Sequence, residues 1–156
     1  MKKKLYLSAP LPFVGQKRMF AREFMKVLDQ FPDDATFVDL FGGSGLLSHI
    51  TKRCKPNATV VYYDFDNYRR RLENIPRTNR LIADIRAIVG NAVPRHKAIT
   101  GDLRERIFKR IQQEERDNGY VDFITLSSSL LFSMKYVLNS VEMQKETLYS
   151  NIRQSD

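Results

Sequence analysis

The stretch from Thr36 to Ile50 constrains the fold more than any other part of the chain. It begins with a β-branched and aromatic run, which is typical of a strand, and ends with apolar residues at helical spacing. Between the two lie Gly42, Gly43 and Gly45, with Ser44 placed to cap the helix. Glycines at a strand-to-helix turn allow positive φ and a close approach of ligand to backbone. The sequence therefore predicts a parallel α/β unit with a nucleotide-type cofactor site, and an ordinary glycine-rich turn is the alternative.

A second strand is predicted over Ala58–Tyr63, and an acidic stretch that ends at Asn67 follows it at once. An acidic residue about 20 positions after a glycine loop, at the tip of the next strand, is where a ribose-binding carboxylate is expected. Asp64 is the first choice for that role and Asp66 is the second. The alternative role is to cap the following helix, which we expect Asp66 or Asn67 to do.

The formal net charge of +8 is spread unevenly along the chain. Residues 1–26 carry seven Lys or Arg against one Glu, whereas residues 27–67 carry six acids against three bases. Residues 68–118 carry thirteen bases against seven acids, and residues 119–156 carry three bases against four acids. An acidic centre between basic flanks suits a polyanionic partner that is reached beside a cofactor pocket. Solvated helix faces are the alternative reading of the same charges.

Residues 68–118 lose the strand pattern and indicate a small helical insertion with a cationic surface. Apolar residues at helical spacing predict two helices there, the second opening with a capping box at Asp102–Glu105. The loop between them holds Arg95, His96 and Lys97. Exposed lysine and arginine neutralise phosphates and position a duplex without reading its sequence. His96 is interpreted as a loop residue rather than a catalyst.

The stretch 120–138 is predicted to be a buried helix, and its run Ser127–Ser129 lacks the glycine elbow and partner histidine of a serine nucleophile. We interpret these serines as structural. A chain of 156 residues, 42% hydrophobic and 28% charged, is expected to be one globular domain in the cytoplasm. No apolar run approaches the roughly 20 residues that a membrane span needs, so no membrane association is expected. A single cysteine and two histidines argue against a zinc site.

Several of these stretches follow the motif order of a known family. Phe13-Val-Gly-Gln-Lys17 resembles the N-terminal Trp/Phe-x-Gly-Gly-Lys motif of Dam-type DNA adenine-N6 methyltransferases. Asp39-Leu-Phe-Gly-Gly-Ser-Gly45 is similar to their main loop for S-adenosylmethionine (SAM). Tyr63-Asp-Phe-Asp-Asn67 looks like their second motif, commonly Asn-Asp-x-Asn, with Tyr63 in place of the leading Asn. Tyr120–Val137 is loosely similar to the family's Phe-x-x-Leu-Asn-Arg stretch.

The resemblance implies a Rossmann-like α/β sheet that binds SAM, with a helical insertion that faces double-stranded DNA. In the family, the aromatic and the lysine of the first motif help to hold SAM, the glycine loop cradles the methionine part, and the acid of the second motif takes the ribose hydroxyls. The implied SAM-binding residues are Phe13, Gly15, Lys17, Asp39, Phe41, Gly42, Gly43, Ser44, Gly45, Asp64 and Phe65. The implied DNA-binding residues are Arg69, Arg70, Arg71, Arg77, Arg95 and Lys97.

One family motif has no counterpart, because the family grips its target adenine with Asp-Pro-Pro-Tyr and no Pro-Pro pair occurs here. In the family this motif lies downstream of the stretch matched by Tyr120–Val137, about where this chain stops. We therefore predict no catalytic residue, and expect a truncated form that binds SAM without transferring a methyl group alone. The sheet is expected to be incomplete, with a free edge that a homodimer would complete.

The expected organisation has three parts. An N-terminal motif and SAM-binding core spans 1–67, a basic DNA-facing insertion spans 68–118, and a return to the core spans 119–156. Two other functions stay open on the sequence alone. One is a non-catalytic nucleic-acid-binding module on a methyltransferase-like scaffold, and the other is a methyltransferase that acts on RNA or protein.

Overall fold

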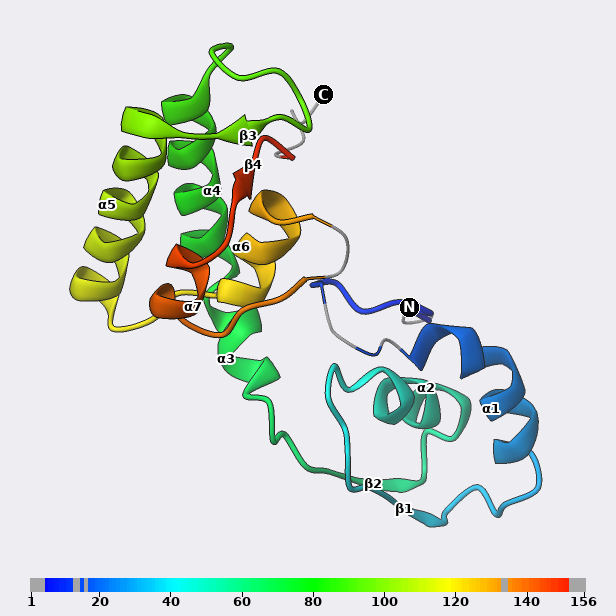
Figure 1. Ribbon diagram of the computed structural model, residues 1–156. Helices are drawn as coiled ribbons and strands as arrows, with labels where there is room; N and C mark the ends of the chain where they lie inside the picture. Colours follow the sequence, from blue (N-terminus) through cyan, green and yellow to red (C-terminus); the bar gives the residue numbers. More distant parts are fainter. Residues whose placement is uncertain (1–4, 13–14, 16, 133–134, 152–156) are drawn as a thin grey trace. The chain divides into compact units, whose positions relative to one another are not determined.

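A computed structural model describes residues 5–12, 15, 17–132 and 135–151 of the chain. The chain divides into two compact units, Met1–Leu72 and Glu73–Asp156 (Figure 1). This division differs from the expected one, which had its first boundary between residues 67 and 68. It also places 119–156 in the same unit as most of the expected insertion, because these residues share one hydrophobic core with it.

The first unit is a mixed α/β structure with a small parallel sheet. Its elements are, in chain order, η1 (Lys17–Phe20), α1 (Ala21–Leu28), β1 (Thr36–Asp39), α2 (Leu46–Cys54), β2 (Thr59–Tyr62) and α3 (Tyr68–Glu73). The two strands pair in register from Thr36 opposite Thr59 to Asp39 opposite Tyr62, with α2 as the connection between them. The predicted succession of strand, glycine loop, helix and second strand is confirmed.

The core of the first unit lies between its helices and one face of the sheet. The buried residues are Ala21, Leu28, Leu46 and Ile50, with Phe24, Met25, Phe37 and Leu47 packed against them. Both strands alternate along their length between exposed and partly buried residues, as the two-residue period of a strand requires. The sheet therefore buries one face only. The glycine loop follows the carboxyl end of β1, and the packing of this buried face fixes the position of β1.

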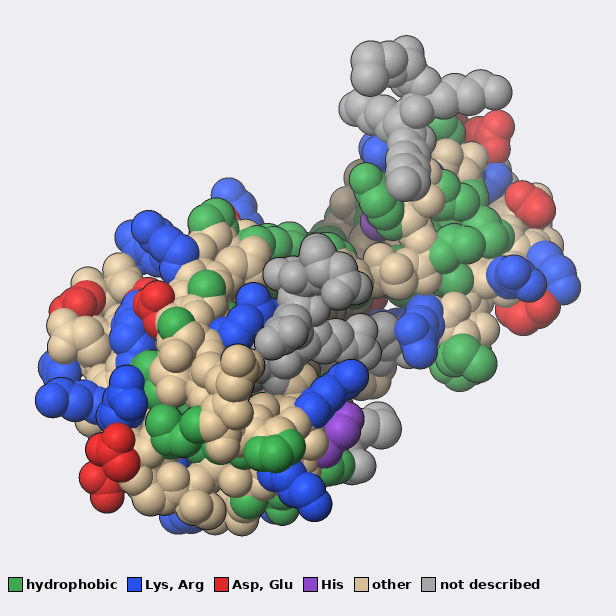
Figure 2. All heavy atoms as spheres, turned by 90° about the horizontal axis from the view of Figure 1, so that it is seen from above, with side chains coloured by type: hydrophobic (Ala, Val, Ile, Leu, Met, Phe, Trp, Pro, Cys, Tyr) green, Lys and Arg blue, Asp and Glu red, His purple; other side chains and the backbone are tan. Residues whose placement is uncertain are grey.

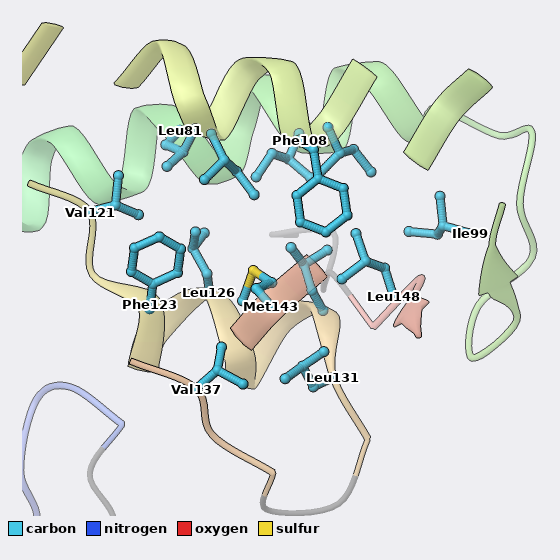
Figure 3. Packing of buried hydrophobic residues seen from close by; sticks show 14 of the residues in the cluster. Leu81, Ile99, Phe108, Val121, Phe123, Leu126, Leu131, Val137, Met143 and Leu148 are labelled. Atoms are coloured by element: carbon cyan, nitrogen blue, oxygen red, sulfur yellow. The ribbon is translucent and has the colours of Figure 1, made fainter. Parts of the chain in front are cut away.

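The second unit is mainly helical. Its elements are α4 (Ile75–Val89), β3 (Ala98–Ile99), α5 (Gly101–Asn118), α6 (Phe123–Leu130), α7 (Ser140–Gln144) and β4 (Leu148–Tyr149). Leu81, Ile85 and Val89 recur every four residues on α4 and enter a core shared with α5, α6 and α7 (Figure 3). Further along the chain, β3 and β4 pair antiparallel, which joins residues about 50 positions apart in one small sheet.

The predicted capping box at Asp102–Glu105 is wrong. α5 begins at Gly101 with Thr100 at the N-cap, and no side chain there accepts a capping hydrogen bond. Asp102 instead forms a 3.8 Å ion pair with Arg106 one turn later. The helix starts before the box because Gly101, at φ 57°, takes the turn into the helix that an aspartate N-cap would otherwise make.

The interpretation of Ser127 as structural is confirmed. Its Oγ donates a 2.7 Å hydrogen bond to the carbonyl of Phe123 and accepts a 3.1 Å hydrogen bond from the backbone N–H of Val137. The hydroxyl therefore links the carbonyl of the first residue of α6 to the N–H of Val137, beyond the end of the helix. Within the described ranges, no helix combines the length and the apolar character needed to cross a membrane.

Candidate functional site

The loop between β1 and α2 turns on glycines in left-handed backbone conformations. Gly43 has φ 49° and Gly45 has φ 67°, a region that other residues adopt only with strain. The N–H of Gly45 donates a 2.8 Å hydrogen bond to the carbonyl of Gly42, which closes the turn. The predicted capping role of Ser44 is wrong, because Gly45 itself is the N-cap and no side chain caps α2. The first backbone N–H groups of α2 therefore have no side-chain cap and can donate hydrogen bonds to other groups.

Gly42 is required for a different reason, because its φ is not positive. A Cβ at this position would lie 2.0 Å from Cε2 and 2.2 Å from Cδ2 of Tyr62. The Tyr62 ring, from the end of β2, thus packs directly on the loop backbone. Its hydroxyl donates a 2.6 Å hydrogen bond to the carbonyl of Gly43. Tyr62 is absent from the predicted site residues, although its place two positions before Asp64 on the predicted strand could have indicated it.

Asp39 ends β1 and is held from two sides. One carboxylate oxygen accepts a 2.8 Å hydrogen bond from the hydroxyl of Ser48 on α2. The other lies 4.0 Å from the ammonium of Lys17, which also donates a 2.7 Å hydrogen bond to the carbonyl of Phe41. The structure therefore brings the lysine of the N-terminal motif to the loop that follows β1, across more than 20 residues of sequence.

Asp64 occupies the tip of β2, where the sequence predicts a ribose-binding carboxylate. Its Oδ1 accepts a 2.7 Å hydrogen bond from the backbone N–H of Tyr68, and its Oδ2 accepts a 2.9 Å hydrogen bond from that of Arg69. Asn67 occupies the expected N-cap position, since its carbonyl accepts a 3.2 Å hydrogen bond from the N–H of Arg71, but the side chain that accepts from the first N–H groups of α3 is that of Asp64, not of Asp66 or Asn67. Each carboxylate oxygen has a second lone pair, so Asp64 retains acceptor capacity in a fixed orientation.

The loop surroundings are electronegative. Burial raises the pKa of Tyr62, and the carboxylates of Asp64, Asp39 and Asp66 raise it further. The same carboxylates favour a cationic group in their vicinity, because charges of opposite sign attract most strongly where water is partly excluded. With its pKa raised, Tyr62 keeps its proton to higher pH than an ordinary tyrosine does, and its hydroxyl remains the donor to the loop.

The remaining predicted cofactor residues are less constrained. Phe13 lies outside the described residues. Gly15 has φ 75°, consistent with the expected tight turn before η1. Phe41 and Phe65, which follow the two strands, are both 78% exposed. The structure therefore gathers Lys17, the glycine loop and both acids at one end of the sheet, with two exposed aromatic rings in the adjoining loops.

The three consecutive arginines of α3 differ in exposure. Arg69 and Arg70 are exposed, whereas Arg71 is buried. Its Nη2 donates a 2.8 Å hydrogen bond to the carbonyl of Pro12, and its guanidinium lies 5.4 Å from the centre of the Tyr68 ring. Arg71 is thus a structural residue of the first unit, and the prediction that it contacts DNA is withdrawn.

The second unit holds the other predicted cations. Arg77 on α4 and the loop residues Arg95 and Lys97 are exposed. His96 between the latter two has φ 64°, and its Nδ1 lies 2.8 Å from Oδ1 of Asn151, which fixes the loop. The space-filling view shows Lys and Arg side chains on the surface with Asp and Glu among them (Figure 2).

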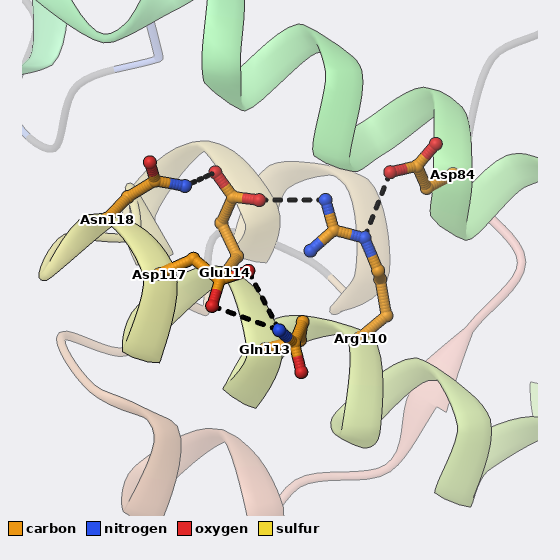
Figure 4. A network of polar contacts seen from close by, with 6 residues as sticks. All are labelled: Asp84, Arg110, Gln113, Glu114, Asp117 and Asn118. Carbon is orange, nitrogen blue, oxygen red and sulfur yellow. Dashed lines mark hydrogen bonds and ion pairs between the residues drawn. The ribbon is translucent and has the colours of Figure 1, made fainter.

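Some cations of α5 are already paired within the fold. Arg110 contacts Asp84 on α4 at 2.9 Å and Glu114 at 2.7 Å, and Asn118 donates to the same glutamate at 2.5 Å (Figure 4). Arg104 donates to the carbonyl of Gln144 at 2.6 Å. These side chains join elements of the second unit, so the positive charge counted from the sequence overstates what is available to a partner.

Comparisons with known proteins identify one relative of the chain. No family model and no solved structure matches the chain. The chain is 40% identical over 158 aligned residues to a Haemophilus influenzae (strain Rd) protein named "Putative methyltransferase". The match covers 99% of this chain and 52% of that protein, so the chain spans about half the length of the curated relative it matches. Over nearly all its length, the chain is therefore homologous to part of a protein that is named as a methyltransferase.

Proposed function

We propose that the first unit is the SAM-binding part of a DNA adenine-N6 methyltransferase with a Rossmann-like sheet. The observation that carries this proposal is the glycine loop at the end of β1, with the oriented Asp64 carboxylate at the end of the neighbouring parallel strand. Ligands of open α/β sheets bind at this end of the strands. The homology to a protein named as a methyltransferase supports SAM over other nucleotide ligands.

The described residues offer partners for each part of SAM. The positive φ of Gly43 and Gly45 shapes the loop backbone, Asp39 provides a negative charge beside the loop, and Asp64 provides acceptors for hydroxyl groups. Lys17 braces the loop through the carbonyl of Phe41. When bound, SAM supplies an electrophilic methyl group on a sulfonium. Since no Asp-Pro-Pro-Tyr occurs in the sequence, we assign cofactor binding to these residues and assign methyl transfer to none of them.

Calorimetric titration with SAM tests the cofactor site. The variant Asp64→Asn keeps the shape of the side chain but loses its charge and one acceptor, and we expect SAM to bind about tenfold more weakly. The matched control is Asp66→Asn, which alters an exposed carboxylate two residues away and is expected to bind SAM like the wild type. Equal losses in the two variants would refute the assignment of Asp64. Circular dichroism of both variants checks that α3 is retained.

Double-stranded DNA is the proposed substrate, supported by the exposed cations Arg77, Arg95 and Lys97 on the second unit. The double variant Arg95→Glu/Lys97→Glu is expected to bind a duplex more weakly. The slope of log K against the logarithm of the salt concentration should also become less steep, by about 0.9 for each phosphate that the variant no longer neutralises. The control Lys109→Glu reverses an exposed lysine on α5 and is expected to change the slope less. Fluorescence anisotropy over a salt series measures both quantities.

Two outcomes would favour the other functions. Duplex binding by a folded chain that shows no SAM binding would favour a non-catalytic nucleic-acid-binding module. SAM binding with a stronger affinity for RNA, or with none for nucleic acid, would favour a methyltransferase of another substrate class.

A further inference from the structure

Three aromatic rings meet where the loop before β3, the segment after α6 and strand β4 come together (Figure 1). The Phe132 ring meets the Tyr149 ring edge-on, with the ring centres 4.4 Å apart, and lies 6.1 Å from the His96 ring. We call these three side chains the aromatic cluster. All three belong to the second unit, so the contacts among them do not depend on where the first unit lies.

Hydrogen bonds fix the frame of the aromatic cluster. Asn151 donates a 3.0 Å hydrogen bond from Nδ2 to the carbonyl of Leu131, the residue before Phe132. Its Oδ1 lies 2.8 Å from Nδ1 of His96, and because an amide oxygen only accepts, Nδ1 is the donor. The backbone N–H of His96 also donates to the carbonyl of Ser150 at 2.9 Å. Phe132 thus stands on a hydrogen-bonded frame, although it is 43% exposed.

An exposed ring is common on protein surfaces, so the surroundings of Phe132 decide its role. Arg95 and Lys97 flank His96 in sequence and are exposed, and neither side chain pairs with an acid among the described residues. A nucleic-acid strand suits both features, because cations neutralise its phosphates and aromatic rings stack on its bases. Bases inside a duplex are stacked on one another, so a base that meets Phe132 has to be unpaired.

We propose that Phe132 stacks on an unpaired base of a DNA strand whose phosphates are neutralised by Arg95 and Lys97. This inference deepens the proposed function, because it rests on those two cations as DNA contacts, but it does not rest on SAM binding. The two kinds of contact respond differently to salt. The slope of log K against the logarithm of the salt concentration counts neutralised phosphates, so loss of a stacked base lowers the affinity and leaves the slope unchanged.

Fluorescence anisotropy over a salt series tests this with the full chain, a single-stranded DNA oligonucleotide and a fully paired duplex of the same sequence. Phe132→Leu keeps an apolar side chain and removes the aromatic face. We expect it to bind the single strand about tenfold more weakly, with an unchanged salt slope, and to bind the duplex like the wild type. Phe132→Tyr keeps the ring and is expected to bind both forms of DNA as the wild type does.

Phe31→Leu is the matched control. Phe31 is 48% exposed and meets the Phe37 ring edge-on, but two acids, Asp33 and Asp34, follow it closely in sequence. This variant should bind the single strand like the wild type. A strand that carries one 2-aminopurine reports stacking directly, since the emission of this base falls when it stacks. The wild type and Phe31→Leu should quench the emission more than Phe132→Leu does, and circular dichroism checks that each variant is folded.

The other outcomes separate this inference from the proposed function. Equal single-strand affinities for Phe132→Leu and Phe31→Leu would overturn the inference and leave the proposed duplex contacts intact. A salt slope that falls with Phe132→Leu would also overturn it, because the substitution would then have disturbed phosphate contacts. Tighter binding of an RNA strand of the same sequence would overturn DNA as the source of the base.

Two further outcomes concern the duplex. A chain that binds the single strand through Phe132 but binds no duplex would support the inference and refute duplex DNA as the substrate. Failure of a folded chain to bind either form would overturn both.

Discussion

At the scale of single residues, the Tyr62 ring leaves no room for a side chain at Gly42. We predict that Gly42→Ala destabilises the chain by about 1–3 kcal/mol, the usual cost of overpacking. The added Cβ would lie 2.0 Å from the tyrosine ring, so either the ring or the loop must move. Urea unfolding measures the loss of stability, and calorimetry with SAM measures the associated loss of binding.

A double-mutant cycle with Tyr62→Ala separates this clash from backbone strain. Removing the ring should relieve the cost of Gly42→Ala, which gives a coupling energy clearly different from zero. Gly101→Ala is the control, because Gly101 has φ 57° and nothing within 4 Å of the added Cβ. Its cost is one of backbone conformation and should be independent of Tyr62. Additivity at Gly42 and Tyr62 would contradict the direct packing of the ring on the loop.

The raised pKa of Tyr62 predicts a loss of stability at alkaline pH. A group whose pKa is higher in the folded state stabilises the fold below its unfolded pKa, which for tyrosine is about 10. Its contribution is lost as the pH rises from there through the folded pKa. We expect the free energy of unfolding to fall over this range, and to fall less in Tyr62→Phe. Equal alkaline slopes for the two proteins would show that Tyr62 does not titrate differently on folding.

At the scale of elements, the N-termini of α6 and α5 can be compared directly, because a side chain caps α6 and none caps α5. Asp122 is buried and accepts hydrogen bonds from both the backbone N–H and the Oγ1 of Thr125, at 3.1 and 2.6 Å. Asp122→Ala should therefore cost about 1–2 kcal/mol in urea unfolding. Asp102→Ala should cost less than about 0.5 kcal/mol, because Asp102 caps nothing and its ion pair is exposed. Similar costs for the two substitutions would contradict the assigned caps.

The same elements show what the sequence can predict. The order of strand, glycine loop, helix and strand is encoded locally by hydrophobic periodicity, and its prediction is correct. The errors lie at helix N-termini, where neighbouring residues can take the same capping role. Ser44 and Asp102 each stand beside a glycine that makes the turn into the helix, and Asp64 rather than Asp66 caps α3. The burial of Arg71 depends on Pro12, which is 59 residues away, and no local pattern reports such a long-range hydrogen bond. The packing of 119–156 with the helices before it is likewise a long-range property.

At the scale of the whole chain, the two units have separate hydrophobic cores, and among the described residues the second core is much the larger. We predict that Ile50→Ala and Ile111→Ala, both fully buried, each cost about 2–5 kcal/mol but in different units. Hydrogen exchange should show reduced amide protection in residues 1–72 for the first variant and in 73–156 for the second. Reduced protection throughout the chain in either variant would mean that the units unfold together.

The division of the chain at Leu72 also has a consequence for biosynthesis. Lys17, the glycine loop and Asp64 all precede the boundary, so the ribosome completes them before most of the second unit exists. At translation rates of roughly 5–20 residues per second, residues 73–156 take several seconds to make, and domains generally fold N-terminal first. The nascent chain therefore presents its candidate cofactor loop to small metabolites before residues 73–156 are complete.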